Sequence, residues 1–305
     1  MPTAPVVGEH YGDVSIREDI TDIIFQITPT DTPVMNITSR GRAKATTHQW
    51  QRRVLTTRQD NANFEGAVYT FTAGNRRTTR VSNETQNFLK EIRVSTTLEA
   101  VEQAGIGSMF SDQAQVATIE LKTDMEHALI QGTLSSGASN AAPRFQGLIE
   151  AIETNATTHT SFTTGTVTLA EVQLNDMLQV CWDNGGAPRD WFMNGRLKRR
   201  ASSFTASSTP YINADEQRVV NTISVYESDF FVIETKLSRD VPSTNVCVNG
   251  ILGLDRTMLE FALLRPVTMM RTAKIASSTD GVIEAEGCPA WGNASGHYYA
   301  DGLAG

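Results

Sequence analysis

The chain has 305 residues, 40% of them hydrophobic and 20% charged, and it carries a formal net charge of −8. The length suggests roughly two domains, or one domain with large insertions. The composition is typical of a globular protein and excludes a disordered or collagen-like chain. The negative charge argues against a protein that condenses on nucleic acid or on an anionic membrane surface.

Cysteine content and hydropathy indicate the cellular compartment of the protein. Cys181, Cys247 and Cys288 are odd in number and far apart in the sequence, which excludes a disulfide framework and a CxxC motif and favours a reducing compartment. No apolar run approaches the ~18 residues of a membrane span, and the first residues lack the basic and apolar regions of a signal peptide. We therefore expect a soluble protein made in a cytoplasm, with no membrane partner.

The charges are unevenly distributed along the chain. Residues 40–93 hold eleven basic and four acidic residues, whereas residues 94–195 hold three basic and twelve acidic residues. A strongly positive segment beside a strongly negative one favours pairing between them, either within one chain or between identical subunits.

The positive segment has the pattern of a two-stranded ribbon. Residues 45–55 and 68–81 alternate Thr, Val, Tyr, Phe, Trp and Arg, which predicts two strands, and the polar residues 56–63 predict the turn region between them. A lone two-stranded ribbon is marginal in water, so we expect this one to lie against another element, most simply another copy of the chain.

A strand and a long helix are predicted next. The strand buries one face through residues of equal parity, interrupted by Lys90: Phe88, Ile92, Val94 and Leu98. The helix is expected from about Ser108 to Gln131, with Ser108 or Ser111 as its N-cap and Gly132 as its end.

The rest of the chain reads as an α+β unit followed by strands. Residues 132–168 are rich in Gly, Ser, Thr and Ala and predict a linker and loops around a short anchor at 145–149, with the domain boundary here. Beyond residue 254 strand and turn signals return. Between the loop region and residue 254 we expect an α+β unit. It consists of a helix over 169–184, a strand over 191–193, a basic helix over 196–204, and strands near 219–226, 230–235 and 246–248.

No catalytic, cofactor or metal site is indicated. Gly105 and Gly107 follow a strand and precede a helix, but Phe110 stands where a dinucleotide-binding turn needs its third glycine. There is no GxxxxGK[ST] loop and no GxSxG elbow, and the five histidines have no metal-ligand spacing. We therefore predict no catalytic residue, no cofactor and no metal.

Basic clusters are the remaining candidates for contacts. They are Arg52-Arg53, Arg76-Arg77-x-x-Arg80 and Arg196-x-Lys198-Arg199-Arg200. Nucleic-acid contacts are one interpretation, but aromatic residues are sparse around these clusters and the chain is acidic. Because guanidinium groups pair well with carboxylates at interfaces, we favour solvated or intersubunit salt-bridging arginines.

A set of short motifs in fixed order resembles the major capsid (head) proteins of tailed bacteriophages, over nearly the whole chain. The motifs are Arg17-Glu18-Asp19-Ile20-Thr21-Asp22-Ile23-Ile24, Thr32-Pro33-Val34-Met35, His48-Gln49-Trp50, Thr85-Gln86-Asn87-Phe88, Glu126-x-Ala128-Leu129, Gly147-Leu148, Gly185-Gly186-x-Pro188, Val225-Tyr226-Glu227-Ser228-Asp229-Phe230 and Leu264-Arg265-Pro266. The resemblance rests on their order and spacing together.

This resemblance implies an α+β fold of the Hong Kong ninety-seven type. It implies an N-terminal arm at 1–43, an extended E-loop β-ribbon at 44–84, a peripheral domain at 85–168 with a spine helix near 108–131, an axial domain at 169–251, and a return to the peripheral domain with a C-terminal tail at 252–305. Such proteins assemble as hexamers and pentamers of an icosahedral shell around double-stranded DNA. Some relatives cross-link an E-loop lysine to a neighbour, but none of the six lysines lies near the expected loop tip, so we predict a shell without cross-links.

The sequence therefore predicts a structural virion protein, not an enzyme, that is assembled in the host bacterial cytoplasm. We expect E-loop arginines to reach acidic residues of a neighbour's peripheral domain; the candidates are Arg52, Arg53, Arg58, Arg76, Arg77, Arg80, Glu120, Asp124 and Glu126. Expected partners are other copies of the chain, DNA bound without sequence specificity, and separate scaffolding, portal and decoration proteins. An encapsulin-like compartment shell and a soluble cytoplasmic enzyme are the alternatives.

Overall fold

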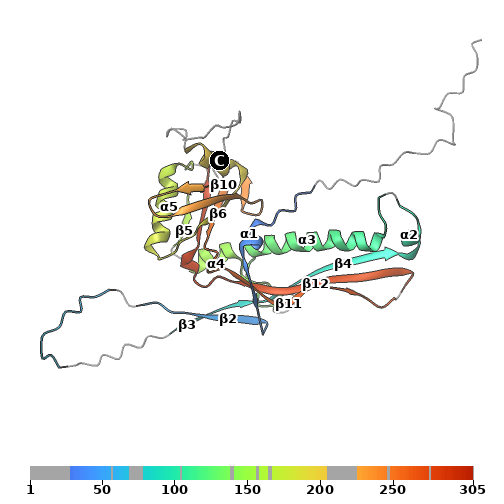
Figure 1. Ribbon diagram of the computed structural model, residues 1–305, viewed down its shortest axis with the longest axis horizontal. Coiled ribbons are helices and arrows are strands. Elements are labelled where there is room, and N and C mark those ends of the chain that lie inside the picture. Colours follow the sequence, from blue (N-terminus) through green and yellow to red (C-terminus); the bar gives the residue numbers. More distant parts are fainter. Residues whose placement is uncertain are drawn as a thin grey trace, which may run out of the picture.

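The computed structural model describes residues 28–55, 58–68, 78–103, 105–137, 141–155, 158–163, 167–204, 225–245, 248–274 and 276–304. Its elongated shape has three parts: a body in which a long helix lies along a sheet, a second lobe around another sheet, and a ribbon that projects away from both (Figure 1). No helix in the described part of the chain is long and apolar enough to cross a membrane.

The body is built on a four-stranded sheet in the order β1-β11-β12-β4, in which β1 runs parallel to β11 and the other pairs are antiparallel. Its strands are β1 (Ser39–Arg42), β4 (Gln86–Ser95), β11 (Glu260–Arg271) and β12 (Ser278–Ala290). The short helix α1 (Pro33–Ile37) precedes β1, so residues near the start of the described chain join strands formed more than 200 residues later.

Helix α3 (Met109–Gln131) covers one face of this sheet (Figure 1). The prediction for this helix is confirmed at both ends: the Ser108 side chain accepts a hydrogen bond from Ser111 N, and Gly132 is the C-cap. Its core positions are buried at helical spacing: Phe110, Ala114, Ala117, Leu121, Met125 and Leu129.

Two local predictions for this region are wrong. Leu98 does not extend the buried face of β4; it is 43% exposed on helix α2 (Thr96–Ala100), because the Ser95 side chain caps that helix and ends the strand. Residues 148–155, expected as loop, form helix α4 (Leu148–Asn155), whose buried Leu148 and Ile152 join the core beside α3.

The second lobe holds a seven-stranded mixed sheet in the order β5-β13-β10-β6-β8-β7, with β9 paired to β10. Its elements are β5 (His159–Ser161), α5 (Glu171–Asp183), β6 (Asp190–Met193), α6 (Gly195–Ser202), β7 (Val225–Glu227), β8 (Val232–Leu237), β9 (Ser243–Asn245), β10 (Val248–Leu254) and β13 (Tyr298–Leu303), with a 3₁₀ turn η3 (Ala294–Gly296) before β13. The predicted helices over 169–184 and 196–204 and the strand over 191–193 are confirmed. The strand predicted near 219–226 overlaps β7 at residues 225–226. The rest of the predicted range, 219–224, lies outside the described part.

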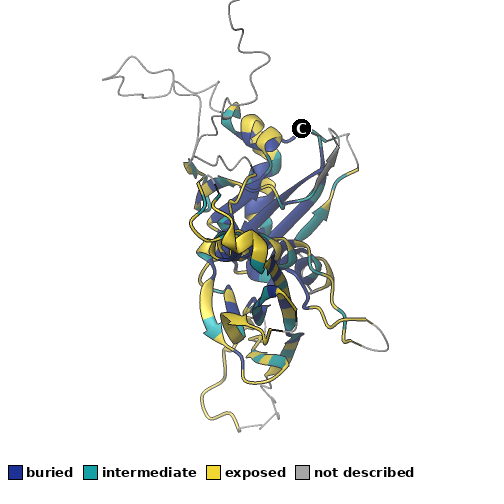
Figure 2. Ribbon diagram, turned by 90° about the vertical axis from the view of Figure 1, so that its right-hand side faces the viewer, coloured by how far each residue is buried: buried dark blue, intermediate teal, exposed yellow. Residues whose placement is uncertain are grey.

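Alternate residues of β6 pack into two different hydrophobic cores. Phe192 packs in the core shared with the body, whereas Trp191 and Met193 pack in a separate core under α5 and α6, as expected for a strand buried on both faces. Figure 2 shows buried residues concentrated in the sheets and exposed residues along the ribbon. The seven-stranded sheet recruits β5 and β13 from outside 169–251, the range that the resemblance gives to the axial domain.

Candidate assembly interface

The projecting ribbon consists of β2 (Thr47–Arg52) and β3 (Thr79–Glu84), paired antiparallel from Thr47 opposite Glu84 to Arg52 opposite Thr79. This confirms the predicted two-stranded ribbon, although its regular pairing is shorter than expected. Residues 53–55, 58–68 and 78 continue it without strand pairing, and residues 69–77 lie outside the described part.

Trp50 and Asn83 fix the foot of the ribbon to the body. Trp50 Nε1 donates to Gly292 O at 3.3 Å, and its ring packs edge-on against Trp291 with centroids 5.2 Å apart. The buried Asn83 amide donates to Gln146 O and Pro289 O at 3.1 and 3.0 Å and accepts from Gln146 N at 2.8 Å. Because this amide satisfies backbone groups from two separate segments, it constrains the direction in which the ribbon leaves the body.

The predicted ribbon arginines point to both sides. Arg52 lies opposite Thr79 and Arg80 lies opposite Gln51, so the two arginines lie on opposite faces of the ribbon. Arg53, Arg58 and Arg80 are exposed and Arg52 is partly buried, and among the described residues none of the four forms an ion pair. Arg76 and Arg77 lie outside the described residues.

Two of the predicted acidic partners already share a cation within the subunit. Lys90 Nζ lies 2.7 Å from Asp124 Oδ2 and 3.5 Å from Glu120 Oε2, while both carboxylates stay about half exposed. The Asp124 hydrogen bond is the main cause that raises the pKa of Lys90. This contact explains why a lysine interrupts the apolar face of β4: it reaches across to α3. Two carboxylates with one lysine leave a net negative charge on the surface of α3.

Glu126, the third predicted acid, is buried instead of facing a neighbour. Its carboxylate accepts backbone N–H bonds from Val34 at 2.8 Å and Met35 at 2.6 Å, at the start of α1. Burial raises the pKa of Glu126 to about 7, although the two backbone bonds work in the opposite direction. Glu126 therefore attaches α1 to α3.

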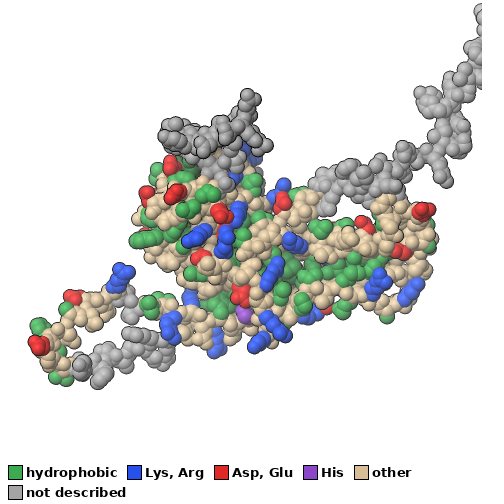
Figure 3. Space-filling view, in the orientation of Figure 1, with side chains coloured by type: hydrophobic (Ala, Val, Ile, Leu, Met, Phe, Trp, Pro, Cys, Tyr) green, Lys and Arg blue, Asp and Glu red, His purple; other side chains and the backbone are tan. Residues whose placement is uncertain are grey.

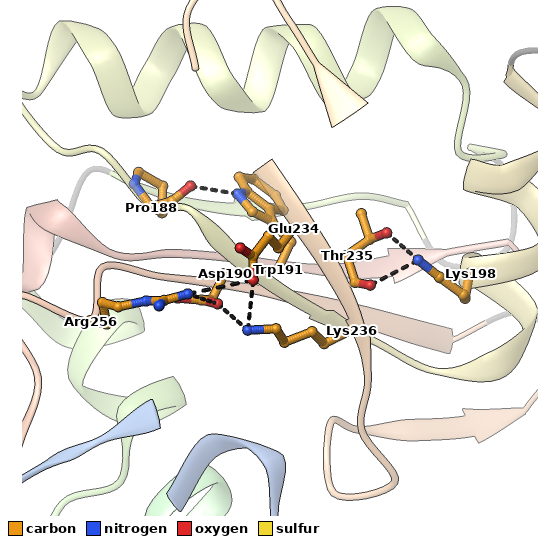
Figure 4. Close-up of polar contacts among 8 residues, drawn as sticks. All are labelled: Pro188, Asp190, Trp191, Lys198, Glu234, Thr235, Lys236 and Arg256. Carbon is orange, nitrogen blue, oxygen red and sulfur yellow. Dashed lines mark hydrogen bonds and ion pairs between the residues drawn. The ribbon is translucent and has the colours of Figure 1, made fainter. Parts of the chain in front are cut away.

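The structure also contains a buried ion-pair cluster that sequence reasoning missed. Asp190 is fully buried and binds Arg256 through two hydrogen bonds of 2.7 and 2.8 Å and Lys236 at 2.5 Å, with Glu234 beside both cations (Figure 4). Burial acts to raise the pKa of Asp190, but the bonds from Arg256 and Lys236 hold that pKa below its usual value. The residues are up to 66 positions apart, so no spacing signal marks them.

The charged and buried side chains described above are suited to packing and ion pairing. In the described part of the chain no cluster of three or more His, Cys, Asp or Glu side chains could hold a metal ion. Buried Cys181 and Cys288 have pKa values raised to about 12 by burial, so they remain thiols.

Comparison with known proteins agrees with this geometry. The fold matches a chain of the capsid of a native GTA particle with a TM-score of 0.68, 11% identity and full coverage of both chains. It matches a protein of Mycobacterium phage Ogopogo with a TM-score of 0.65 and 12% identity, over 94% of this chain and 96% of the other. An encapsulin of Synechococcus elongatus matches with a TM-score of 0.63 and 10% identity, over 95% and 93%.

At the sequence level no curated protein matches. The family model described as SU10 major capsid protein, however, matches residues 6–304. The fold is thus the α+β capsid fold that the sequence resemblance implied, and the expected structural, non-enzymatic role is confirmed. The chain belongs to the SU10 major capsid protein family and is a subunit of a homo-oligomeric capsid shell.

Proposed function

We propose that this capsid protein forms a Hong Kong ninety-seven type icosahedral head, in which it assembles as hexamers and pentamers around double-stranded DNA. The observation that carries the proposal is the ribbon, which is fixed at its foot by Trp50 and Asn83 and projects beyond its own subunit (Figure 1). An extended ribbon with so little cover of its own is stabilised when a neighbouring copy supplies the missing contacts.

The ribbon arginines are the proposed charged contacts. Arg52, Arg53, Arg58 and Arg80 have no ion-pair partner among the described residues, and Glu120 and Asp124 retain exposed carboxylate surface beside Lys90. A neighbour's guanidinium would balance the remaining negative charge there. Glu126 is left out of this contact because it is buried and already bonded. Arg76 and Arg77 stay in the proposal on sequence grounds alone.

We further propose that the shell holds DNA without sequence specificity and is assembled in the host cytoplasm with separate scaffolding, portal and decoration proteins. The net charge of −8 supports a container that does not bind phosphates tightly, because tight binding would oppose both packaging and release. An encapsulin-like shell would instead hold protein cargo. Nucleic-acid analysis of particles purified from infected cells distinguishes the two.

Charge reversal tests the ribbon contact. Arg53→Glu with Arg80→Glu should prevent shell formation, measured by electron microscopy and sedimentation, while circular dichroism of the subunit stays unchanged. Arg53→Lys with Arg80→Lys is the matched control, because it keeps both charges, and it should form shells. Normal shells from the charge-reversed variant would contradict the proposed contact. Covalent multimers that survive boiling in detergent would contradict the expected absence of cross-links.

A further inference from the structure

The outer part of the E-loop exposes large apolar side chains that the arginine contacts do not explain. Val54, Leu55, Phe64 and Val68 are 79–92% exposed, whereas no other large apolar side chain among the described residues exceeds 64%. Exposed apolar groups gathered on one projecting segment mark an interaction site. Figure 3 shows hydrophobic and acidic side chains together at the far end of the ribbon.

Phe64 is presented by an ordered turn. Ala67 N donates to Phe64 O at 3.1 Å, and Gly66 at the third position of this turn has φ +80°, which favours glycine. Two acids lie close to Phe64 in the chain: Glu65 follows it within the turn, and Asp60 accepts a hydrogen bond from Ala62 N. The tip is therefore an aromatic side chain flanked by negative charge, unlike the basic foot of the same ribbon.

The body offers a complementary groove. A cavity of about 310 Å³ opens between α1, α3 and β11, with a largely apolar lining. Its apolar lining includes Met35, Ile119, Leu121, Met125 and Val267, and two exposed cations, Arg40 and Lys122, stand at it. Neither cation forms an ion pair among the described residues: Arg40 Nη1 lies 3.5 Å from Met35 Sδ, and Lys122 Nζ donates to Asn36 Oδ1 at 3.4 Å.

The tip and the groove are complementary in polarity and in charge. An aromatic side chain that enters an apolar pocket is the usual dominant contact of a protein interface, and opposite charges at the rim orient the approach. The ribbon carries its tip away from α1 and α3 of its own subunit (Figure 1), so the phenyl ring that fills this groove belongs to another copy.

We propose that Phe64 of one subunit inserts into the groove between α1, α3 and β11 of a second copy, with Asp60 and Glu65 beside Arg40 and Lys122. This inference rests on the proposed function, in which the ribbon contacts a neighbouring subunit. It adds the anchoring residue and the surface that receives it.

Cross-linking tests the contact directly. In a chain with Cys247→Ser, shells that carry Phe64→Cys and Val267→Cys are treated with a short bismaleimide; Cys181 and Cys288 are buried and remain unreactive. We expect dimers and higher multimers on denaturing gels, and no multimers from either single-cysteine control. Shells that yield no multimers, or that yield only a link within one chain, would overturn the proposal.

Charge exchange and truncation provide a second test. Because Phe64 is 92% exposed, Phe64→Ala should leave the subunit folded but raise the concentration needed for shell formation by at least tenfold, and Phe64→Leu should recover most of this loss. Glu65→Lys and Lys122→Glu should each impair assembly, and their combination should restore it. If reversal of Arg53 and Arg80 blocks assembly while these variants have no effect, the tip contact is wrong and the proposed function stands. If neither set affects assembly, the arginine contact and the tip contact are both wrong.

Discussion

Glu126 provides a quantitative test of how α1 is attached to α3. The carboxylate is buried, and its two oxygens accept the Val34 and Met35 backbone N–H groups. Glu126→Gln keeps the size of the side chain but cannot ionise, so it separates the effect of charge from the effect of packing.

The direction in which pH changes the stability follows from the raised pKa of Glu126. In the folded subunit the Glu126 carboxyl holds its proton up to about pH 7, whereas in the unfolded chain it releases the proton near pH 4.5. The stability associated with that proton is therefore complete below pH 4.5, falls as the pH rises to 7, and is constant above. A difference of about 2.5 pKa units corresponds to about 3 kcal/mol. The free energy of unfolding of Glu126→Gln, relative to the wild-type chain, should rise by up to this amount between pH 4.5 and 8.

Urea unfolding of the unassembled subunit, followed by circular dichroism at half-unit pH intervals, measures this difference. The glutamine amide leaves one N–H group without an acceptor, but that cost does not depend on pH and appears as a constant offset. Other titrating groups cancel because both proteins contain them. Parallel stability curves for the two proteins would refute the reasoning that burial outweighs the backbone bonds at Glu126.

Three further predictions concern stability in other parts of the fold. Burial lowers the pKa of His297 to about 4, so the contribution of His297 to the free energy of unfolding should fall by up to about 3 kcal/mol as the pH drops from 6.5 towards 4; in the same urea assay this appears as a loss of wild-type stability relative to His297→Asn. Asp190→Asn removes the counter-charge of two cations that remain partly solvated, so thermal unfolding should show a loss of about 3 kcal/mol, the lower end for a broken buried pair; an unchanged midpoint would contradict this role. Gly302 and Gly185 both have φ near +80°, but a Cβ would lie 2.2 Å from Phe162 O at Gly302 and touch nothing at Gly185. Gly185→Ala should therefore cost about 1–2 kcal/mol in denaturant unfolding and Gly302→Ala clearly more; equal costs would argue against the steric contact.

Local signals explain the elements that were predicted correctly. The bounds of α3 depend on a serine cap, a glycine end and a regular apolar repeat, all of which lie within one segment. Helix α4 has eight residues and lies in a stretch rich in Gly, Ser and Thr; such a short helix depends on its packing beside α3 and not on its own propensity. Leu98 was misplaced because the cap at Ser95 competes with the alternation of β4.

The assembly surface likewise combines features set by local sequence with features set by the packing of distant segments. Composition and spacing predicted a basic ribbon and, in the acidic segment after it, a long helix, because charge sums and alternation are properties of the sequence. The shell protein was implied by the resemblance of the ordered motifs to phage major capsid proteins. Composition, spacing and motifs could not distinguish the roles of Glu120, Asp124 and Glu126, three acids within seven residues of one helix. Lys90 comes from β4 to the first two, and α1 covers the third from 92 residues away. Burial depends on which distant segment packs against each side chain, so only the tertiary structure decided which carboxylates remain at the surface for a neighbour.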